Sequence, residues 1–460
     1  MSSALGWTAR EIAAAVQRGE VTPRDVVRDH LDLIGRVDPV VGAFVRVDGD
    51  RALAEAETLG ANPELSRLPL AGVPIAVKGN TAVAGEPTRH GCAVTDATPA
   101  RHDHEVVARL RAAGAIVVGV TRMPELGVWG TTDDAAGVTR NPWQLDRTAG
   151  GSSGGAAAAV ASGMVPVAQG NDGMGSIRIP AAACGVVGVK PGDGLVPADI
   201  GATAWRGLTE NGPLATTVAD AALVLSVMAG RRELASVAPT AGALRIAAST
   251  RVPVAGVRLD PEVARAVVRV AGTLRRAGHA VVRADPPYSL AMANAIAAWF
   301  AAAASDEVFG VGEGFAQLEG RQRHHARIGR QLERWGRVRE SDRQTWTARV
   351  GEFFHDHDVL ITPVTTGRPL LAEPGGTRWG ERSWFANFSA NLRWAPFAGA
   401  WNFARFPAMT VPAAMHSSGA PIGVQLVVAP GREDVLLSVA AQWESLAPWQ
   451  RFAPMSGLHG

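Results

Sequence analysis

The sequence predicts an α/β protein in which helices pack against a parallel or mixed β-sheet. An apolar run over 72–77 is followed by a helical pattern over 103–114 and a second apolar run over 115–120, the spacing of a βαβ unit. Apolar runs at 359–361 and 422–428 predict further strands near the C-terminus. Neither an internal repeat nor a linker divides the 460 residues, so we expect a single domain.

Helices are expected to precede this sheet over the first 60 residues. Thr8 and Glu11 have the spacing of a capping box, and Thr22-Pro23 places an N-cap before a proline at the first helical position. Asp103 is the expected N-cap of the helix within the βαβ unit. An amphipathic pattern over 432–443 predicts a closing helix.

Composition and charge exclude several classes of protein. Hydrophobic residues make up 47% of the chain and charged residues 19%, which is typical of a globular protein. The net charge of +2 does not favour nucleic acid or an anionic membrane. The longest apolar run, 290–304, is shorter than the roughly 20 residues of a spanning helix. The N-terminus lacks the pattern of a signal peptide, and two cysteines cannot form a disulfide framework. We therefore expect a cytoplasmic protein without nucleic acid or membrane partners.

The scarcity of lysine draws attention to two positions. Of 45 basic residues only Lys78 and Lys190 are lysines. Arginine stays protonated, whereas a buried lysine can lose its proton and act as a base. A lysine retained in such a chain is either a chance survivor or a residue whose chemistry arginine cannot perform.

Two glycine-rich segments, 150–155 and 171–178, are candidates for chemistry. The first lacks the Gly-Lys-Ser/Thr ending of a phosphate-binding P-loop. A serine in a tight glycine-rich turn exposes its Oγ, and neighbouring backbone N–H groups can point at a developing oxyanion. A serine nucleophile needs a base, which is usually histidine but is lysine in Ser-Lys variants. Lys78, at the end of the first predicted strand, fits this role.

Several long motifs in the expected order resemble the amidase signature family, and they occupy residues 73–78, 141–155, 175–181, 358–363 and 421–426. The resemblance extends from about residue 8 to 443 and is weakest over 221–355. It implies a single α/β domain over 1–460 with a mixed β-sheet core covered by helices on both faces.

The resemblance also implies how this domain is divided. A core over about 65–220 would carry the catalytic residues. A helical region over 221–355 would shape the pocket, and strands and a helix over 356–445 would complete the core.

The resemblance implies a Ser-Ser-Lys triad. Ser176 matches the nucleophile, Ser152 matches a bridging serine that follows a cis peptide bond, and Lys78 matches the base. Neutral Lys78 would take the proton of Ser152 while Ser152 takes that of Ser176, which attacks an amide carbonyl. Water would then cleave the acyl-enzyme. Burial without a carboxylate partner is expected to lower the pKa of Lys78.

The loop before Ser176 would supply the oxyanion hole through the backbone N–H groups of Gly173, Met174, Gly175 and Ser176. Met174 stands where the family usually has glycine, so it is strained if its φ is positive and otherwise keeps its amide available. Its side chain is also expected to narrow the acyl pocket. Gly79 stands where family members often carry an acid.

Three residues complete the predicted oxyanion-hole and substrate-binding set. Asp172 and Arg178 would hold the turn rigid through a buried carboxylate that accepts backbone N–H bonds or pairs with the arginine. Ser153 would hydrogen-bond the loop without joining the proton relay. Lys190, in a further family landmark, is interpreted as structural.

Other signals are set aside. The histidine clusters at 102–104 and 355–358 resemble metal ligands only in composition, and no metal or other cofactor is expected. His324-His325 is expected at the surface. Seven of the 13 tryptophans lie between Trp299 and Trp401, including Trp379, Trp384 and Trp394. They predict ordinary core packing or an aromatic-lined pocket.

The sequence thus predicts a metal-independent serine amidohydrolase, an amidase that cleaves a linear or cyclic amide, with a small apolar or aromatic carboxamide as substrate. Two alternatives stay open. One is a glutamyl-tRNA amidotransferase A-like subunit, which needs partner subunits and polar recognition of glutamine. The other is a catalytically silent binding protein of the same fold. A homodimer is compatible with the sequence.

Overall fold

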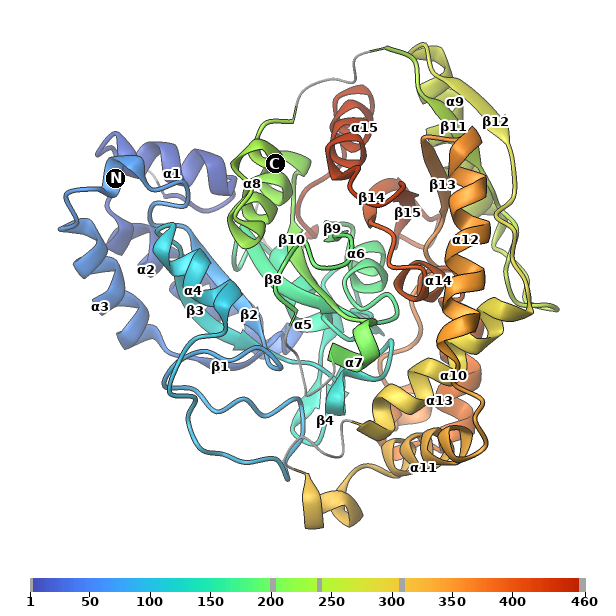
Figure 1. The fold of residues 1–460 in the computed structure, drawn as a ribbon. Helices are drawn as coiled ribbons and strands as arrows, with labels where there is room; N and C mark the ends of the chain where they lie inside the picture. Colours follow the sequence, from blue (N-terminus) through green and yellow to red (C-terminus); the bar gives the residue numbers. More distant parts are fainter. Residues whose placement is uncertain (1–2, 199–203, 238–241, 306–310, 455–460) are drawn as a thin grey trace.

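A large mixed β-sheet runs through the computed structural model, which describes residues 3–198, 204–237, 242–305 and 311–454 (Figure 1). Within these residues the sheet has 11 strands. In spatial order they are β1 (Phe44–Val47), β3 (Ile116–Thr121), β2 (Pro74–Lys78), β8 (Val167–Asp172), β10 (Glu210–Ala215), β9 (Val187–Lys190), β14 (Ala408–Met415), β15 (Pro421–Val427), β13 (Val359–Pro363), β11 (Arg245–Ala248) and β12 (Ala280–Arg283).

The sheet combines parallel and antiparallel pairs. β3, β2 and β8 are parallel at one side, and β13, β11 and β12 are parallel at the other. The strands between them pair antiparallel. Two small hairpins lie outside this sheet: β4 (Asp133–Asp134) with β5 (Gly137–Val138), and β6 (Arg140–Asn141) with β7 (Gln144–Thr148).

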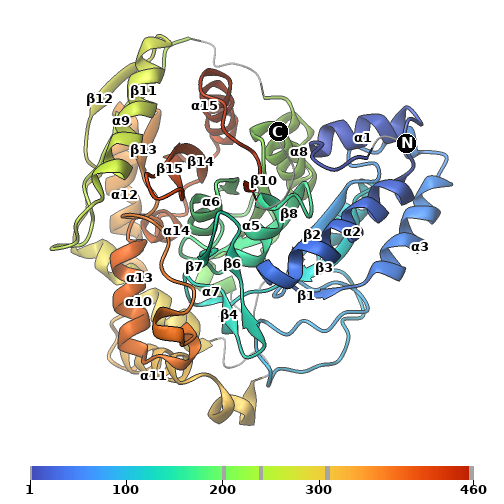
Figure 2. The same ribbon diagram turned by 180° about the vertical axis from the view of Figure 1, so that it is seen from behind.

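The helices lie on both faces of the sheet (Figures 1 and 2). They are α1 (Ala9–Gln17), α2 (Pro23–Val41), α3 (Gly49–Gly60), α4 (Glu105–Ala112), α5 (Gly154–Ala161), α6 (Arg178–Cys184), α7 (Ala204–Gly207), α8 (Val218–Ala229), α9 (Pro261–Arg276), α10 (Leu290–Ser305), α11 (Gly320–Arg334), α12 (Glu340–Asp356), α13 (Trp384–Trp394), α14 (Gly399–Phe403) and α15 (Glu433–Leu446).

The alternation of side chains along β2 explains the two faces. Ile75 and Val77 point into a core shared with α1, α4, α8, α9 and α15. Ala76, between them, points into the opposite core, which contains residues of α2, α3, α5 and α6. Successive residues of a strand face opposite sides of a sheet, so a strand buried on both faces is apolar throughout. The predicted single α/β domain with a mixed sheet and helices on both faces is confirmed.

The N-terminal helices begin where the sequence predicts. Thr8 and Glu11 form the complete capping box of α1, and the Thr22 side chain caps α2 directly before Pro23. The prediction that Asp103 caps the next helix is wrong. His104 is the N-cap of α4, while Asp103 accepts the Ala84 N–H at 2.7 Å and forms an ion pair with Arg111.

The prediction of a largely helical segment over 221–355 needs a second correction, because this segment also supplies β11 and β12 to the main sheet. Each is four residues long, which is too short for an alternating pattern to be told from part of a helix. With α9 between them they form a further parallel strand–helix–strand unit. No helix within the described ranges combines the length and the apolar character needed to cross a membrane.

Candidate active site

Lys78 is the last residue of β2, and its amine lies in the protein interior. β2 runs parallel to β8, so the carboxyl ends of the two strands meet at one edge of the sheet, where Asn171 and Asp172 end β8. Lys78 is only 1% exposed. Its Nζ lies 2.7 Å from the Ser152 Oγ and 3.1 Å from the Asn171 carbonyl oxygen. Among the described residues no carboxylate forms an ion pair with this amine.

Burial lowers the pKa of Lys78 to about 7, and the negative charge of Asp172 opposes part of this shift. The direction agrees with the sequence-based expectation, and the cause is the predicted one: an amine removed from water without a paired carboxylate. Near pH 7 a substantial fraction of Lys78 is therefore neutral and carries a free lone pair.

Ser152 lies in a buried turn between β7 and α5. The Gly151–Ser152 peptide bond is cis, as the family resemblance implies. The whole segment 150–155 is buried, so its amides do not form an open cradle for a phosphate. The neighbouring Ser153 joins this turn to two others: its N–H donates to the Ser176 carbonyl at 3.0 Å, and its hydroxyl donates to the Asn171 carbonyl at 3.1 Å.

Ser176 lies two residues before α6 and lines a cavity of about 710 Å³. Its hydroxyl makes no hydrogen bond with any residue that the structure describes. The structure therefore joins Lys78 to Ser152 and draws the turns of Ser152 and Ser176 together through Ser153. It does not form a direct hydrogen bond between the Ser152 and Ser176 hydroxyls. Without a ligand, contacts of this kind are often long and tighten only when substrate binds.

The loop formed by residues 173–177, here called the Ser176 loop, has three N–H groups that are unpaired among the described residues and two, those of Gly175 and Ile177, that donate to Asp172. The N–H groups of Gly173, Met174 and Ser176 have no acceptor among the described residues. The N–H of Gly175 instead donates to the Asp172 carboxylate at 2.7 Å. The expectation that Gly175 offers its amide to an oxyanion is therefore wrong in this structure, because Asp172 already satisfies that donor.

Gly175 itself is required by the shape of the loop. Its φ is +117°, and a Cβ at this position would lie 2.6 Å from the Cβ of Ala398. Met174 is not among the residues with positive φ, so the strained alternative for this position does not apply. Its side chain lines the cavity and packs against Gly399, as expected for a residue that narrows the pocket.

Asp172 and Arg178 form a fully buried ion pair behind the Ser176 loop. The guanidinium donates to both carboxylate oxygens, at 2.9 and 3.0 Å, and the carboxylate also accepts the Ile177 N–H at 3.0 Å. Burial disfavours the charged carboxylate, but the charge and hydrogen bonds of Arg178, with the Asn402 hydrogen bond and the charge of Lys190, together hold the pKa of Asp172 well below its ordinary value. Both side chains are fully enclosed and lie outside the cavity lining, where they support the loop from behind.

Two residues from the C-terminal part of the chain complete this support, and the sequence-based reasoning did not assign them a role. Asn402 in α14 donates to the Asp172 carboxylate and carbonyl, each at 2.9 Å. Gln425 in β15 accepts from the Arg178 guanidinium at 2.6 Å. Gln425 lies within the family motif over 421–426, but the motif did not indicate that Gln425 contacts Arg178.

The second lysine lies elsewhere in the interior. Lys190 donates to the Pro191 carbonyl at 2.7 Å, and burial lowers its pKa while burial raises that of the nearby Glu210. It does not line the cavity and makes no hydrogen bond to either serine, in agreement with the structural role expected of it.

The cavity beside Ser176 has an aromatic wall formed by Trp129, Tyr288, Trp299 and Phe388. The other tryptophans named above, Trp379, Trp384, Trp394 and Trp401, do not line it, so packing accounts for most of the tryptophan-rich stretch.

The expectation that His325 lies at the surface is wrong. It is fully buried behind the wall, with its ring centroid 4.3 Å from that of Trp299, and burial lowers its pKa to about 3.

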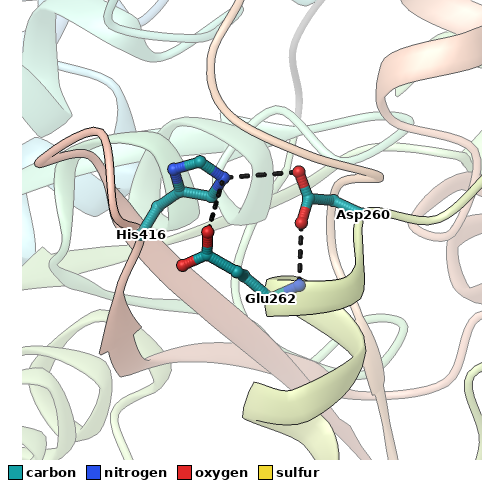
Figure 3. Close-up of side chains that lie close together, drawn as sticks. All are labelled: Asp260, Glu262 and His416. Atoms are coloured by element: carbon teal, nitrogen blue, oxygen red, sulfur yellow. Dashed lines mark hydrogen bonds and ion pairs between the residues drawn. The ribbon is translucent and has the colours of Figure 1, made fainter.

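Among the described residues, the histidine clusters at 102–104 and 355–358 do not bring three possible metal ligands close together. Three such ligand atoms do lie close together in the group formed by Asp260, Glu262 and His416 (Figure 3). The His416 Nε2 lies 3.3 Å from an Asp260 oxygen and 3.6 Å from a Glu262 oxygen. Asp260 also caps α9, and Glu262 accepts the Ser417 N–H at 2.8 Å. The three side chains thus clamp the start of α9 to the turn after β14, and the expectation of no metal stays a prediction.

Comparisons with known proteins agree with this geometry. A family model described as Amidase matches residues 25–437. The putative amidase AmiB2 of Mycobacterium tuberculosis is 40% identical over 448 residues, which cover 95% of each chain. The acylamidase of Rhodococcus erythropolis is 34% identical over 480 residues, which cover 99% of this chain and 98% of the relative. A solved 6-aminohexanoate cyclic dimer hydrolase complexed with substrate is 32% identical, with a TM-score of 0.83 and coverage of 96% and 97%.

The chain belongs to the amidase family. The prediction of an enzyme that hydrolyses amide bonds is confirmed at the level of this class.

The buried ion pair generates a prediction about stability. Asp172→Asn removes the counter-charge of the buried Arg178, so we expect the free energy of unfolding to fall by about 3–5 kcal/mol. Urea denaturation followed by circular dichroism measures the change. Glu57→Gln is the matched control, because it breaks only the exposed pair of Glu57 with Arg24 and should leave the midpoint nearly unchanged. Equal urea midpoints of unfolding for the two variants would contradict the role given to Asp172.

Proposed function

We propose that the protein hydrolyses small carboxamides through an acyl-enzyme on Ser176, with Ser152 and Lys78 as the proton relay. The observation that carries this proposal is the 2.7 Å contact between a buried, substantially neutral Lys78 amine and the Ser152 hydroxyl. A neutral amine accepts a proton from the Ser152 hydroxyl through its lone pair. Ser152 then accepts the proton of Ser176 once a bound substrate draws the two hydroxyls together.

The remaining steps follow from the arrangement around Ser176. Its oxygen attacks the carbonyl carbon, and the unpaired amides of Gly173, Met174 and Ser176 stabilise the oxyanion. The relay returns the proton to the departing amine, and water later releases the acid from the acyl-enzyme by the same path. Rigid support of the loop by Asp172 and Arg178 keeps these donors aimed at the reacting carbonyl.

The cavity supports a small substrate with an apolar or aromatic acyl part. Its volume of about 710 Å³ and its aromatic wall fit such a group, and Met174 narrows the space beside Ser176. The contribution of residues 251–255 and 288–299 to the lining supports a pocket-shaping role for the segment over 221–355.

Neither alternative function gains support from these features. An amidotransferase subunit would need polar recognition of glutamine, whereas most of the lining is apolar. A silent binding protein was suggested by Met174, but this residue is unstrained and leaves its amide available.

Labelling with a serine-reactive fluorophosphonate tests the proposed function. We expect stoichiometric labelling at Ser176 in the wild type and none in Ser176→Ala, because the relay activates only this hydroxyl. Ser289→Ala is the matched control, since Ser289 lines the same cavity and takes no part in the relay. Before labelling, the wild type should also hydrolyse free amides without ATP or a partner subunit. Unlabelled wild type, or labelling at another serine, would refute the proposal.

The pKa of Lys78 generates a prediction about the pH dependence. Below pH 7 the amine is protonated and cannot accept a proton, so kcat/KM should rise with pH through about 7 and level off above it. Lys78→Arg should lower kcat by several orders of magnitude at every pH, because arginine stays charged. Lys190→Arg, which alters the other buried lysine, should leave the rise of kcat/KM centred at about pH 7. Appreciable activity in Lys78→Arg would contradict the role of Lys78 as the base.

A further inference from the structure

Among the described residues, one charged side chain lines the cavity beside Ser176. This side chain is Arg251, in the segment between β11 and α9. The rest of the lining is mainly aliphatic, aromatic or glycine, with the side-chain amide of Asn391 as one exception. That amide is already engaged: its oxygen accepts the Gly130 N–H at 2.7 Å and its nitrogen donates to the Asn387 carbonyl at 2.8 Å. Four neutral groups of the lining also lack hydrogen-bond partners among the described residues: the Tyr288 and Ser289 hydroxyls and the indole N–H groups of Trp129 and Trp299. Arg251 is thus the charged group that can meet an anionic ligand away from Ser176.

The Arg251 guanidinium forms no hydrogen bond and no ion pair with any residue in the described part of the chain. Its situation differs from that of Arg245, at the start of the preceding strand, whose guanidinium pairs with Asp358 at 2.8 Å. Arg251 is exposed and also lines the cavity, so it lies where the cavity meets solvent. An unpaired guanidinium at this position is available to a carboxylate, which it matches with two parallel N–H donors.

The backbone that carries Arg251 is held in place. The Ser249 hydroxyl oxygen accepts the Arg251 N–H at 3.2 Å, and the same hydroxyl donates to Asp285 at 2.7 Å. Asp285 is the acidic group on the neighbouring segment. Burial raises the pKa of the cavity-lining Tyr288, and the charge of Asp285 adds to this effect while that of Arg251 opposes it. The positive charge of Arg251 therefore reaches the cavity wall and is not cancelled by an ion pair.

We propose that Arg251 selects amides whose acyl part ends in a carboxylate beyond an apolar spacer. This inference rests on the proposed function, since it assumes that Ser176 receives the acyl group. The apolar lining accommodates the spacer, and the guanidinium pairs with the carboxylate at the mouth of the cavity. The acyl part stays bound to Ser176 after the amine leaves, so the same contact orients it for attack by water. The contact is partly solvated, so we expect it to change kcat/KM by about fivefold.

A matched pair of substrates tests this specificity. Glutaryl-4-nitroanilide and valeryl-4-nitroanilide have acyl chains of equal length, and only the first ends in a carboxylate. We expect the wild type to prefer the glutaryl compound by about fivefold in kcat/KM at low salt. Arg251→Gln should abolish this preference and Arg251→Glu should reverse it. The preference should also shrink at about 1 M salt, where the Debye length is about 3 Å.

Arg258→Glu is the matched control, because Arg258 is an exposed arginine of the same segment that does not line the cavity. It changes the net charge equally and should keep the preference. The inference is overturned if Arg251→Glu and the wild type show the same preference, or if Arg258→Glu changes it as much as Arg251→Glu does.

The two proposals fail in distinguishable ways. Hydrolysis of both anilides without a preference would refute the role of Arg251 and leave the proposed function intact. If Ser176 is labelled but neither anilide is hydrolysed, the concentration of each anilide that protects Ser176 from labelling replaces turnover as the readout. The glutaryl compound should then protect at about one fifth of the concentration that the valeryl compound needs. Absence of both hydrolysis and labelling would refute the proposed function itself.

Discussion

The site depends on the burial of the Lys78 amine without a counter-charge. Water would stabilise the charged form, whereas the interior offers the Ser152 hydroxyl and the Asn171 carbonyl, so the neutral form is populated near pH 7. Both contacts come from residues distant in the sequence: Asn171 lies on β8, which pairs with β2, and Ser152 lies in the turn before α5. The chemistry proposed for this amine is therefore a consequence of sheet assembly and not of the residues next to it in the sequence.

A second constraint acts on the Ser176 loop and joins distant parts of the chain. The Asp172 carboxylate accepts backbone N–H groups of the loop, and Arg178 neutralises its charge. Asn402 and Gln425 complete the hydrogen bonds of this pair. The conformation of the loop therefore requires the C-terminal strands as well as the segment that carries the serines. Asn402 and Gln425 both lie within residues 25–437, the part of the chain that the family model matches.

The sequence predicted those features that depend on local residue order. The apolar run ending at Lys78, the capping box of Thr8 and the glycine-rich turns all had local signals, and the long motifs identified the family. Features set by contacts between distant residues were missed. Asn402 and Gln425 contact Asp172 and Arg178 from more than 200 residues away, and no local pattern indicates these contacts. β11 and β12 were too short to recognise, and Arg251 and His325 gain their surroundings only from the packing of α10 and its neighbours around the cavity.

The most direct test of this account is an NMR titration of the lysine side chains. With ¹³Cε-labelled lysine the chain gives only two such signals, from Lys78 and Lys190, and loss of one signal in Lys78→Arg assigns them. The account predicts that the Lys78 signal titrates with a midpoint near 7 in the folded protein. A midpoint near 10.4, the ordinary value of a solvated lysine, would mean that the amine is charged at neutral pH and would contradict the account.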